Sequence, residues 1–198
     1  MNIHKNARTT PISRGVMDLK GNLLFTLGER HELQPFNHPT DIAVAPDGDI
    51  DVCDGYAGSR VHWFSKDGRL KKSWGEPGEG PAEFSLPHGI WVLRDGRVLV
   101  ADLENCRVQV FTRDGAYLTE WHDFDRPTDI YVDKDDVVYV ADEGSRLTAL
   151  TPEGKMLGRC RATVSQPHGI YGDSKGNIYV SESTARPARI CKLTLVTS

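Results

Sequence analysis

The sequence predicts an all-β fold, a β-propeller built from four-stranded blades. Two observations carry this prediction: short motifs recur at a nearly fixed period, and turn residues separate short runs of β-branched and aromatic residues. A third is that the 198 residues show no convincing helical period. A β-sandwich would not repeat its sequence at a fixed period, so blades are the better interpretation.

The first two strands of each repeat are marked by a proline motif and an acidic motif. The proline motif is HPTDIAV (38–44), LPHGIWV (86–92), RPTDIYV (126–132) and QPHGIYG (166–172). Its prolines are 48, 40 and 40 residues apart. The acidic motif is DVCD (51–54), LVAD (99–102), YVAD (139–142) and YVSE (179–182). A period near 40 residues is typical of a propeller blade.

The third and fourth strands follow after Asp-Gly or similar turns, in which glycine accepts a positive φ. The third strand is SRVHWF (59–64), CRVQVF (106–111), SRLTAL (145–150) and ARICKL (188–193). The fourth is RLKKSW (69–74), AYLTEW (116–121) and KMLGRC (155–160). Each repeat therefore supplies the strands of one blade.

We expect an N-terminal tail over residues 1–15 and one propeller domain over residues 16–198. Its repeats lie near 36–75, 84–121, 124–160 and 165–195. Residues 16–27 align with a third and a fourth strand, and the strand around 23–27 would close the last blade. This predicts about five blades, or an incomplete six-bladed ring lacking roughly one N-terminal blade. An open ring would self-associate through its exposed edge strands.

Composition indicates a folded domain without a large basic surface. The chain is 38% hydrophobic and 26% charged, with a formal net charge of -4, which argues against nucleic acid or acidic lipid as a partner. No apolar run is long enough for a transmembrane helix, and no apolar stretch follows the basic residues near the start. We therefore expect a cytoplasmic protein whose four cysteines, none in a C-x-x-C pair, are reduced thiols.

An insertion, GEPGEGPAE (75–83), explains the longer first spacing. A Gly/Pro-rich surface loop is the preferred interpretation, and the alternative is a lid or rim of a pocket.

The repeats resemble NHL repeats, PxGIxxDxxGxxYVxDxxNxRVQxF, over residues 36–194. A narrower resemblance is to peptidyl-α-hydroxyglycine α-amidating lyase and its bacterial relatives. It rests on DGYAGSRV (54–61), SWGEPGEGPAEFSLPHGI (73–90) and ADLENCRVQVF (101–111). The resemblance implies a six-bladed propeller with an axial zinc ion, which splits a peptidyl-α-hydroxyglycine into a peptide amide and glyoxylate.

His88 and His168 occupy equivalent positions two repeats apart. Inner strands of a propeller begin at the mouth of its channel, so both imidazoles would face a common axial point, where neutral imidazole is a good zinc ligand. The resemblance identifies them with the family's second and third zinc ligands, and the first would lie in an upstream blade. His4, His31 and His38 are candidate substitutes outside the P-H-G context. The alternative for His88 and His168 is a histidine in a turn that is hydrogen-bonded to the backbone.

Tyr56, in CDGYAGSR, matches the tyrosine that serves as the proposed general base of the family. A phenol acts as a base near neutral pH only where a neighbouring cation favours the phenolate. The alternative is a buried aromatic residue packed between blades.

Two positions depart from the family pattern. Leu103 stands where the family has an arginine, and losing such an electrostatic partner costs on the order of 10²–10³ in rate. The family's structural calcium site includes an acidic residue directly after the third histidine, and here that residue is Gly169, which argues against calcium.

The remaining recurrent carboxylates are interpreted as structural. Asp41 and Asp129 would accept backbone N–H groups at blade starts, with help to an axial cation as the alternative. The acidic residues that end the second strands would form weak, partly exposed pairs with the arginines that follow. These pairs are Asp54–Arg60, Asp102–Arg107, Asp142–Arg146 and Glu182–Arg189.

Two functions are compatible with these residues. The first is a zinc-assisted lyase in which zinc binds the α-hydroxyl group, Tyr56 takes its proton and the C–N bond breaks. The second is a non-catalytic NHL propeller that binds a protein, peptide or small molecule at the channel mouth. The acidic net charge disfavours RNA binding.

Overall fold

The computed structural model describes residues 15–17, 23–27, 35–161, 163–183 and 189–194. All regular elements in these ranges are β-strands, which confirms the predicted all-β class. Within the same ranges, no helix is long and apolar enough to cross a lipid bilayer.

Four antiparallel sheets, numbered here as blades 1 to 4, follow one another along the chain. Blade 1 contains β3 (Asp41–Val44), β4 (Ile50–Asp54), β5 (Arg60–Phe64) and β6 (Leu70–Trp74). Blade 2 contains β9 (Pro87–Val92), β10 (Val98–Asp102), β11 (Arg107–Phe111) and β12 (Tyr117–Trp121). Blade 3 contains β13 (Pro127–Val132), β14 (Val138–Asp142), β15 (Arg146–Leu150) and β16 (Met156–Arg161). Blade 4 contains β17 (Pro167–Gly172), β18 (Asn177–Glu182) and β19 (Ile190–Thr194).

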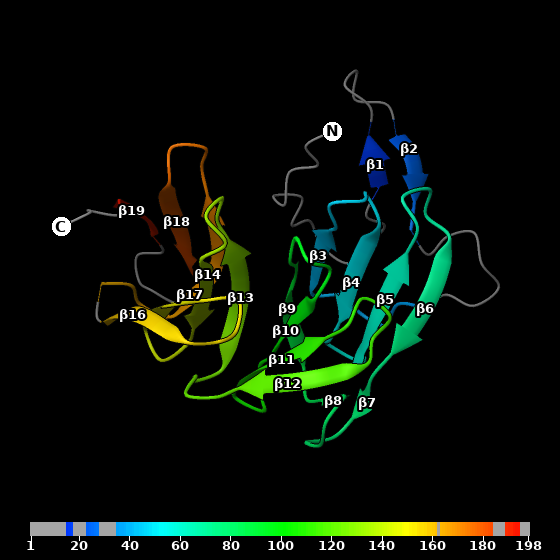
Figure 1. The fold of residues 1–198 in the computed structure, drawn as a ribbon, viewed down its shortest axis with the longest axis horizontal. Helices are drawn as coiled ribbons and strands as arrows, with labels where there is room; N and C mark the ends of the chain where they lie inside the picture. Colours follow the sequence, from blue (N-terminus) through cyan, green and yellow to red (C-terminus); the bar gives the residue numbers. More distant parts are fainter. Residues whose placement is uncertain (1–14, 18–22, 28–34, 162, 184–188, 195–198) are drawn as a thin grey trace.

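The blades are arranged as a propeller (Figure 1). Their first strands are neighbours in space, because β3 contacts β9, β9 contacts β13 and β13 contacts β17. Blades 1 and 4 lie at the two ends of this series (Figure 1). The predicted repeats therefore correspond to four blades within the described residues.

The N-terminal strands form a separate hairpin rather than the missing edge of blade 4. β1 (Gly15–Met17) pairs antiparallel with β2 (Leu23–Thr26), as expected for a third and a fourth strand. Among the described residues, β2 is not paired with β19, so the prediction that this strand closes the last blade is wrong. Leu27 instead packs with Ile50, Val52 and Phe64 of blade 1. The predicted tail lies outside the described residues except for Gly15.

Glycine turns and tryptophans join the outer parts of neighbouring blades. Gly115 and Gly154 have φ values of 82° and 83°, in the region that favours glycine. A Cβ atom on Gly115 would lie 2.6 Å from Trp74, and one on Gly154 would lie 2.3 Å from Trp121. Each tryptophan at the end of a fourth strand therefore packs on the turn glycine of the next blade.

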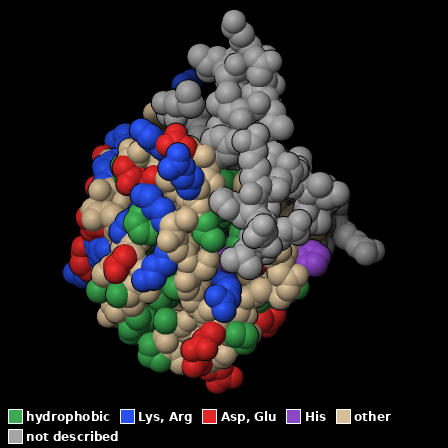
Figure 2. All heavy atoms as spheres, turned by 90° about the vertical axis from the view of Figure 1, so that its right-hand side faces the viewer, with side chains coloured by type: hydrophobic (Ala, Val, Ile, Leu, Met, Phe, Trp, Pro, Cys, Tyr) green, Lys and Arg blue, Asp and Glu red, His purple; other side chains and the backbone are tan. Residues whose placement is uncertain are grey.

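The hydrophobic core lies mainly between consecutive blades. One cluster joins blades 1 and 2, a second joins blades 2 and 3, and a third joins blades 3 and 4. On the face shown in Figure 2, Lys and Arg side chains are interspersed with Asp and Glu side chains. That face therefore carries no field of a single sign.

Candidate functional site

His88, the second residue of β9, is 4% exposed. Its Nδ1 atom lies 2.7 Å from the backbone oxygen of Thr128 in blade 3. A carbonyl oxygen only accepts hydrogen bonds, so Nδ1 carries the proton and Nε2 has a lone pair. A backbone carbonyl that fixes the tautomer in this way is common behind metal-bound or catalytic histidines.

His168 holds the equivalent position in β17, two blades further along. Its ring meets the His88 ring edge to face, with centroids 4.9 Å apart. The structure thus brings together the two histidines that recur in the P-H-G motifs. Their role as metal ligands stays a prediction.

Tyr56 lies in the loop after β4 and completes this group. Its hydroxyl oxygen is 3.3 Å from Nε2 of His88, so the phenol is placed to donate to the lone pair of the imidazole. The side chain is 58% exposed. Tyr56 is therefore not an aromatic residue buried between blades, and more than half of it is accessible to solvent.

A recurring backbone bond positions this loop. The Tyr56 N–H donates to the carbonyl of His38, the residue before the proline in the motif of its own blade. In blade 2 the Leu103 N–H donates to Leu86, and in blade 3 the Glu143 N–H donates to Arg126. Tyr56, Leu103 and Glu143 therefore occupy equivalent places in three neighbouring blades, although the intervening sequence lengths differ.

The residues before the prolines share an unusual backbone conformation that sequence reasoning missed. Their φ values are positive, at 69° for His38, 64° for Leu86, 56° for Arg126 and 45° for Gln166. Such values are strained for side chains other than glycine. In this conformation each of these residues accepts, at its carbonyl oxygen, a backbone N–H group of the loop that follows the second strand. The only feature of the sequence that marks the conformation is the recurring position before a proline.

Leu103 is 3% exposed. The side chain that stands at the position of the family's arginine is therefore removed from solvent.

Asp41 and Asp129 join consecutive blades. The Ile90 N–H donates to Asp41 at 3.0 Å, and the Ile170 N–H donates to Asp129 at 2.9 Å. The threonine beside each aspartate extends the same contact, since the Thr40 hydroxyl donates to the Pro87 oxygen at 2.7 Å. Both carboxylates thus accept backbone N–H groups, as the structural interpretation expects.

The pairs after the second strands follow the prediction in blades 2 to 4. Arg107, Arg146 and Arg189 each donate to the acidic residue of their own blade. The Asp102–Arg107 pair is buried, with side chains 0% and 6% exposed, so the expectation of partial exposure is wrong there. Burial raises the pKa of Asp102, against the lowering effect of its hydrogen bonds from Asn105, Ser85 and Arg107.

Blade 1 departs from the predicted pairing. Arg60 is exposed, and the nearest partner of Asp54 on β5 is His62, with Nε2 3.6 Å from a carboxylate oxygen. The Asn37 N–H donates to the same oxygen of Asp54 at 2.6 Å. The carboxylate of Asp54, at the end of β4 and two residues before Tyr56, is thus held by a backbone N–H group.

The donor set fits zinc in part. Two adjacent imidazoles, one with a fixed tautomer, supply nitrogen ligands of the type that zinc prefers. No group of three or more His, Cys, Asp or Glu residues that could hold a metal occurs among the described residues. His38 is exposed and lies 3.1 Å from the Asn37 side chain, and His4 and His31 lie outside the described residues. The four cysteines include Cys53, which is buried, and all those described are free thiols.

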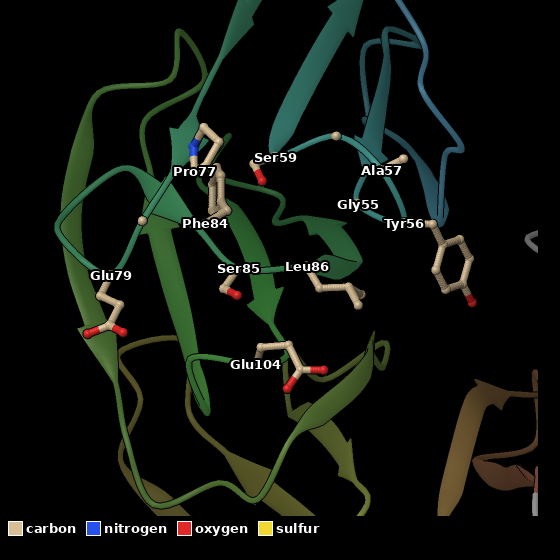
Figure 3. A pocket seen from close by; sticks show the side chains of 12 residues that line it. Gly55, Tyr56, Ala57, Ser59, Pro77, Glu79, Phe84, Ser85, Leu86 and Glu104 are labelled. Carbon is tan, nitrogen blue, oxygen red and sulfur yellow. The ribbon is translucent and has the colours of Figure 1, made fainter.

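A cavity of about 460 Å³ adjoins the Tyr56 loop (Figure 3). Its lining comes from three places: the loop at 55–59, the segments 77–79 and 84–86, and Glu104 of blade 2. In Figure 3, Ser85 and Leu86 lie between the Tyr56 loop and Glu104, and Glu79 lies at the end of the cavity away from Tyr56. The insertion at 75–83 is therefore part of a pocket wall, which was the less favoured of its two interpretations.

Comparison with known proteins defines the class: the chain is a propeller that contains NHL repeats. The NHL repeat matches residues 36–64 and 84–111. Human NHL repeat-containing protein 3 is 34% identical over 146 residues, which cover 72% of this chain and 38% of that protein. The chain therefore spans well under half the length of this relative.

The narrower resemblance is to the amidating lyases. Peptidyl-alpha-hydroxyglycine alpha-amidating lyase 1 of Drosophila melanogaster is 31% identical over 115 residues, covering 52% of this chain and 21% of that protein. Among solved structures, virginiamycin B lyase from Staphylococcus aureus aligns with a TM-score of 0.68 at 16% identity, over 94% of this chain and 64% of that chain. At this identity the match shows the fold alone. The chain is a β-propeller whose first two blades match the NHL repeat, and it resembles the amidating lyases.

Proposed function

We propose that this chain acts as an amidating-lyase-type propeller, which cleaves peptidyl-α-hydroxyglycine into a peptide amide and glyoxylate. The observation that carries the proposal is the contact of the Tyr56 hydroxyl group with Nε2 of His88, beside the ring of His168. The named lyase among its relatives supports the same assignment.

Each of these residues has a task in the proposed reaction. Thr128 holds the His88 tautomer, and His88 orients the phenol of Tyr56. As the phenolate, Tyr56 takes the proton of the α-hydroxyl group, the C–N bond breaks with formation of the aldehyde carbonyl, and Tyr56 passes that proton on to the amide nitrogen, which returns it to the phenolate form. One proton leaves oxygen and one arrives at nitrogen, so no further reactant is needed.

His88, through Nε2, and His168 would hold a zinc ion, which would then take the place of the Tyr56 hydroxyl proton at that nitrogen. When bound, zinc supplies Lewis-acid polarisation of the substrate oxygen and favours the phenolate form of a nearby tyrosine.

A second candidate is a non-catalytic scaffold that binds peptide or another ligand at the same mouth. The observation that favours it is the buried alkyl side chain of Leu103 in the place equivalent to Tyr56 of blade 1. A site with leucine in place of the arginine that the family has here keeps its shape for binding. It lacks the positive charge that would stabilise negative charge developing on the substrate.

The deciding experiment combines metal analysis with glyoxylate release from a peptidyl-α-hydroxyglycine. We expect the purified protein to take up zinc and the His88→Ala variant to lose it, with His122→Ala, at an exposed histidine beside Glu120, as the matched control. We expect glyoxylate release to rise by on the order of 10²-fold in Leu103→Arg. If neither the unmodified protein nor Leu103→Arg takes up zinc or releases glyoxylate while folded, the result would favour the non-catalytic scaffold instead.

A further inference from the structure

The two histidines of the candidate site each lie in a short P-H-G-I segment at the start of an inner strand. His88 belongs to β9 and His168 to β17. The inner strand of blade 3, β13, lies between these two strands and contacts both of them (Figure 1). The groups that hold the two segments in place therefore decide where the two imidazole rings meet.

The His88 segment is held on both sides by blade 1. The Thr40 hydroxyl group donates to the oxygen of Pro87, directly before the histidine, at 2.7 Å. The Ile90 N–H group, two residues after the histidine, donates to Asp41 at 3.0 Å. The Thr-Asp dipeptide of the P-T-D motif thus binds the backbone before and after His88.

The His168 segment is held in the same way by blade 3. The Thr128 hydroxyl group donates to the Pro167 oxygen at 2.9 Å. The Ile170 N–H group donates to Asp129 at 2.9 Å. Because the peptide unit is planar, a bond to the carbonyl of the residue before a histidine also fixes the plane that contains the Cα atom of that histidine. The same arrangement therefore occurs twice, from blade 1 to blade 2 and from blade 3 to blade 4.

Thr128 contacts both histidine segments at once. Its hydroxyl group serves Pro167, with a longer contact of 3.1 Å to the Ala141 oxygen. Its backbone oxygen lies 2.7 Å from Nδ1 of His88. Thr128 is fully buried, so water does not compete for these bonds. One residue of blade 3 therefore fixes the ring of His88 and the backbone that carries His168.

Gly89 leaves room for the contact between Thr128 and His88. A Cβ atom on Gly89 would lie 2.9 Å from the Thr128 oxygen and 2.8 Å from the Cα atom of Asp129. Glycine in a strand permits such a close approach of a second backbone. The glycine of this P-H-G segment thus allows β9 to lie near enough to β13 for the imidazole to reach the carbonyl group.

We propose that the Thr-Asp dipeptides at 40–41 and 128–129 position the two histidines, and that Thr128 sets the geometry of both. These residues act through the imidazoles, by fixing where Nε2 of His88 and the ring of His168 lie. The inference rests on the proposed function, in which the two imidazoles are the zinc ligands. Hydrogen-bond partners behind metal ligands typically change metal affinity by roughly 10–100-fold when they are replaced.

The first test needs no metal. In NMR spectra of the metal-free protein, we expect a nuclear Overhauser effect between the ring protons of His88 and His168, because their ring centroids are 4.9 Å apart. We expect this effect to be lost in Thr128→Val, which removes the hydroxyl donor and keeps the shape of the side chain. Thr128→Ser keeps the donor and is expected to retain the effect. An unchanged effect in folded Thr128→Val would overturn the proposal.

Thr148→Val is the matched control. Thr148 is also buried in blade 3, on β15, and its hydroxyl oxygen accepts from Arg159 at 2.9 Å. This variant loses a buried hydroxyl group of the same kind, so we expect it to be less stable without a change at the histidines. If Thr148→Val also loses the effect between the rings, any weakening of blade 3 moves the histidines and the specific role of Thr128 is contradicted.

Thr40→Val provides the test if Thr128→Val does not fold. Thr40 is only partly buried, and it holds the segment of His88 through Pro87. We expect the effect between the two rings to weaken in this variant, because the backbone before His88 is released. A folded Thr40→Val with the full effect would show that the dipeptides do not position the rings.

Zinc affinity distinguishes this inference from the proposed function. Competition with a chromophoric chelator gives the dissociation constant for zinc, which we expect to be about tenfold higher in Thr128→Val than in the unmodified protein or in Thr148→Val. Equal zinc affinity in all three proteins would retain the proposed zinc site and contradict the positioning role. A protein that binds no zinc, but whose ring contact depends on Thr128, would retain the positioning role and contradict the zinc site.

Discussion

Blades 1 and 2 have the same strands and the same turns, but their interiors differ in polarity. The fully buried second residue of the second strand is Asp51 in blade 1 and Leu99 in blade 2. The buried third residue of the third strand is His62 in blade 1 and Gln109 in blade 2. The comparison teaches that the repeat fixes backbone geometry, whereas the buried polar residues are free to change from blade to blade as long as they find partners.

The partners differ accordingly. In blade 2, Asp102 is held by Arg107 of its own blade. In blade 1, Asp51 receives the guanidinium group of Arg113 from the turn of blade 2, at 2.5 Å, and Arg113 also lies over the Trp63 ring, 4.7 Å from its centroid. Blade 2 is therefore held together internally, and blade 1 partly through its neighbour.

The largest expected effect concerns the difference between buried Arg107 of blade 2 and exposed Arg60 of blade 1. Arg107→Met removes the counter-charge of buried Asp102 and the donors to three carbonyls of the insertion, so we expect the free energy of unfolding to fall by about 3–5 kcal/mol. Arg60→Met, at the equivalent but exposed position of blade 1, should change it by less than about 0.5 kcal/mol. Urea unfolding of both variants measures the difference, and similar losses would show that the two blades do not differ in this way.

A second prediction sharpens the contact between these blades. Gly115→Ala forces a Cβ atom to within 2.6 Å of Trp74, whereas Gly96→Ala meets no atom within 4 Å. Both residues have positive φ, at 82° and 90°, so both variants share the backbone strain of about 1 kcal/mol. We expect Gly115→Ala to lose about 2 kcal/mol more because of overpacking. Thermal unfolding compares them, and equal losses would exclude the tryptophan contact as the cause.

The sequence was sufficient for the blades because propeller repeats carry their own register. The alternation of P-T-D and P-H-G motifs predicted where His88 and His168 lie, and the structure places their rings side by side. That Asp41 accepts a backbone N–H group also followed from its place at a strand start, whereas the position of the donor, Ile90, in the next blade did not. Such features depend on local spacing, which a single sequence displays.

Other features depended on contacts that spacing does not reveal. The pairing of Asp54 with His62 instead of Arg60 is set by which side chain of β5 faces inward. The Arg107 guanidinium group donates to three carbonyls of the insertion, 24 to 28 positions away, and backbone carbonyls leave no signature in a sequence. The prediction that the strand around 23–27 closes the last blade was wrong. This strand, β2, pairs with β1, because closing the short loop between neighbouring strands costs less entropy than bringing distant parts of the chain together.

The smallest expected effect concerns the pH dependence of blade 1. Burial raises the pKa of Asp51 to about 6, with Arg113 acting in the opposite direction. A carboxyl group whose pKa is higher in the folded than in the unfolded state binds its proton more tightly when folded. Its contribution to stability is therefore greatest at low pH and is lost as the pH rises through about 6. Blade 2 has Leu99 at this position, a side chain that does not titrate.

Asp51→Asn removes the titrating group and keeps the shape of the side chain. We expect the free energy of unfolding of the unmodified protein to fall by about 1 kcal/mol from Asp51 between pH 5 and pH 7, and the variant to lack that component. Urea unfolding at the two pH values measures it, with Asp67→Asn, an exposed turn residue of the same blade, as the control that keeps the slope. If Asp51→Asn keeps the slope as well, the Arg113 ion pair outweighs the burial of Asp51, and this position of blade 1 contributes no more to the pH dependence than Leu99 does in blade 2.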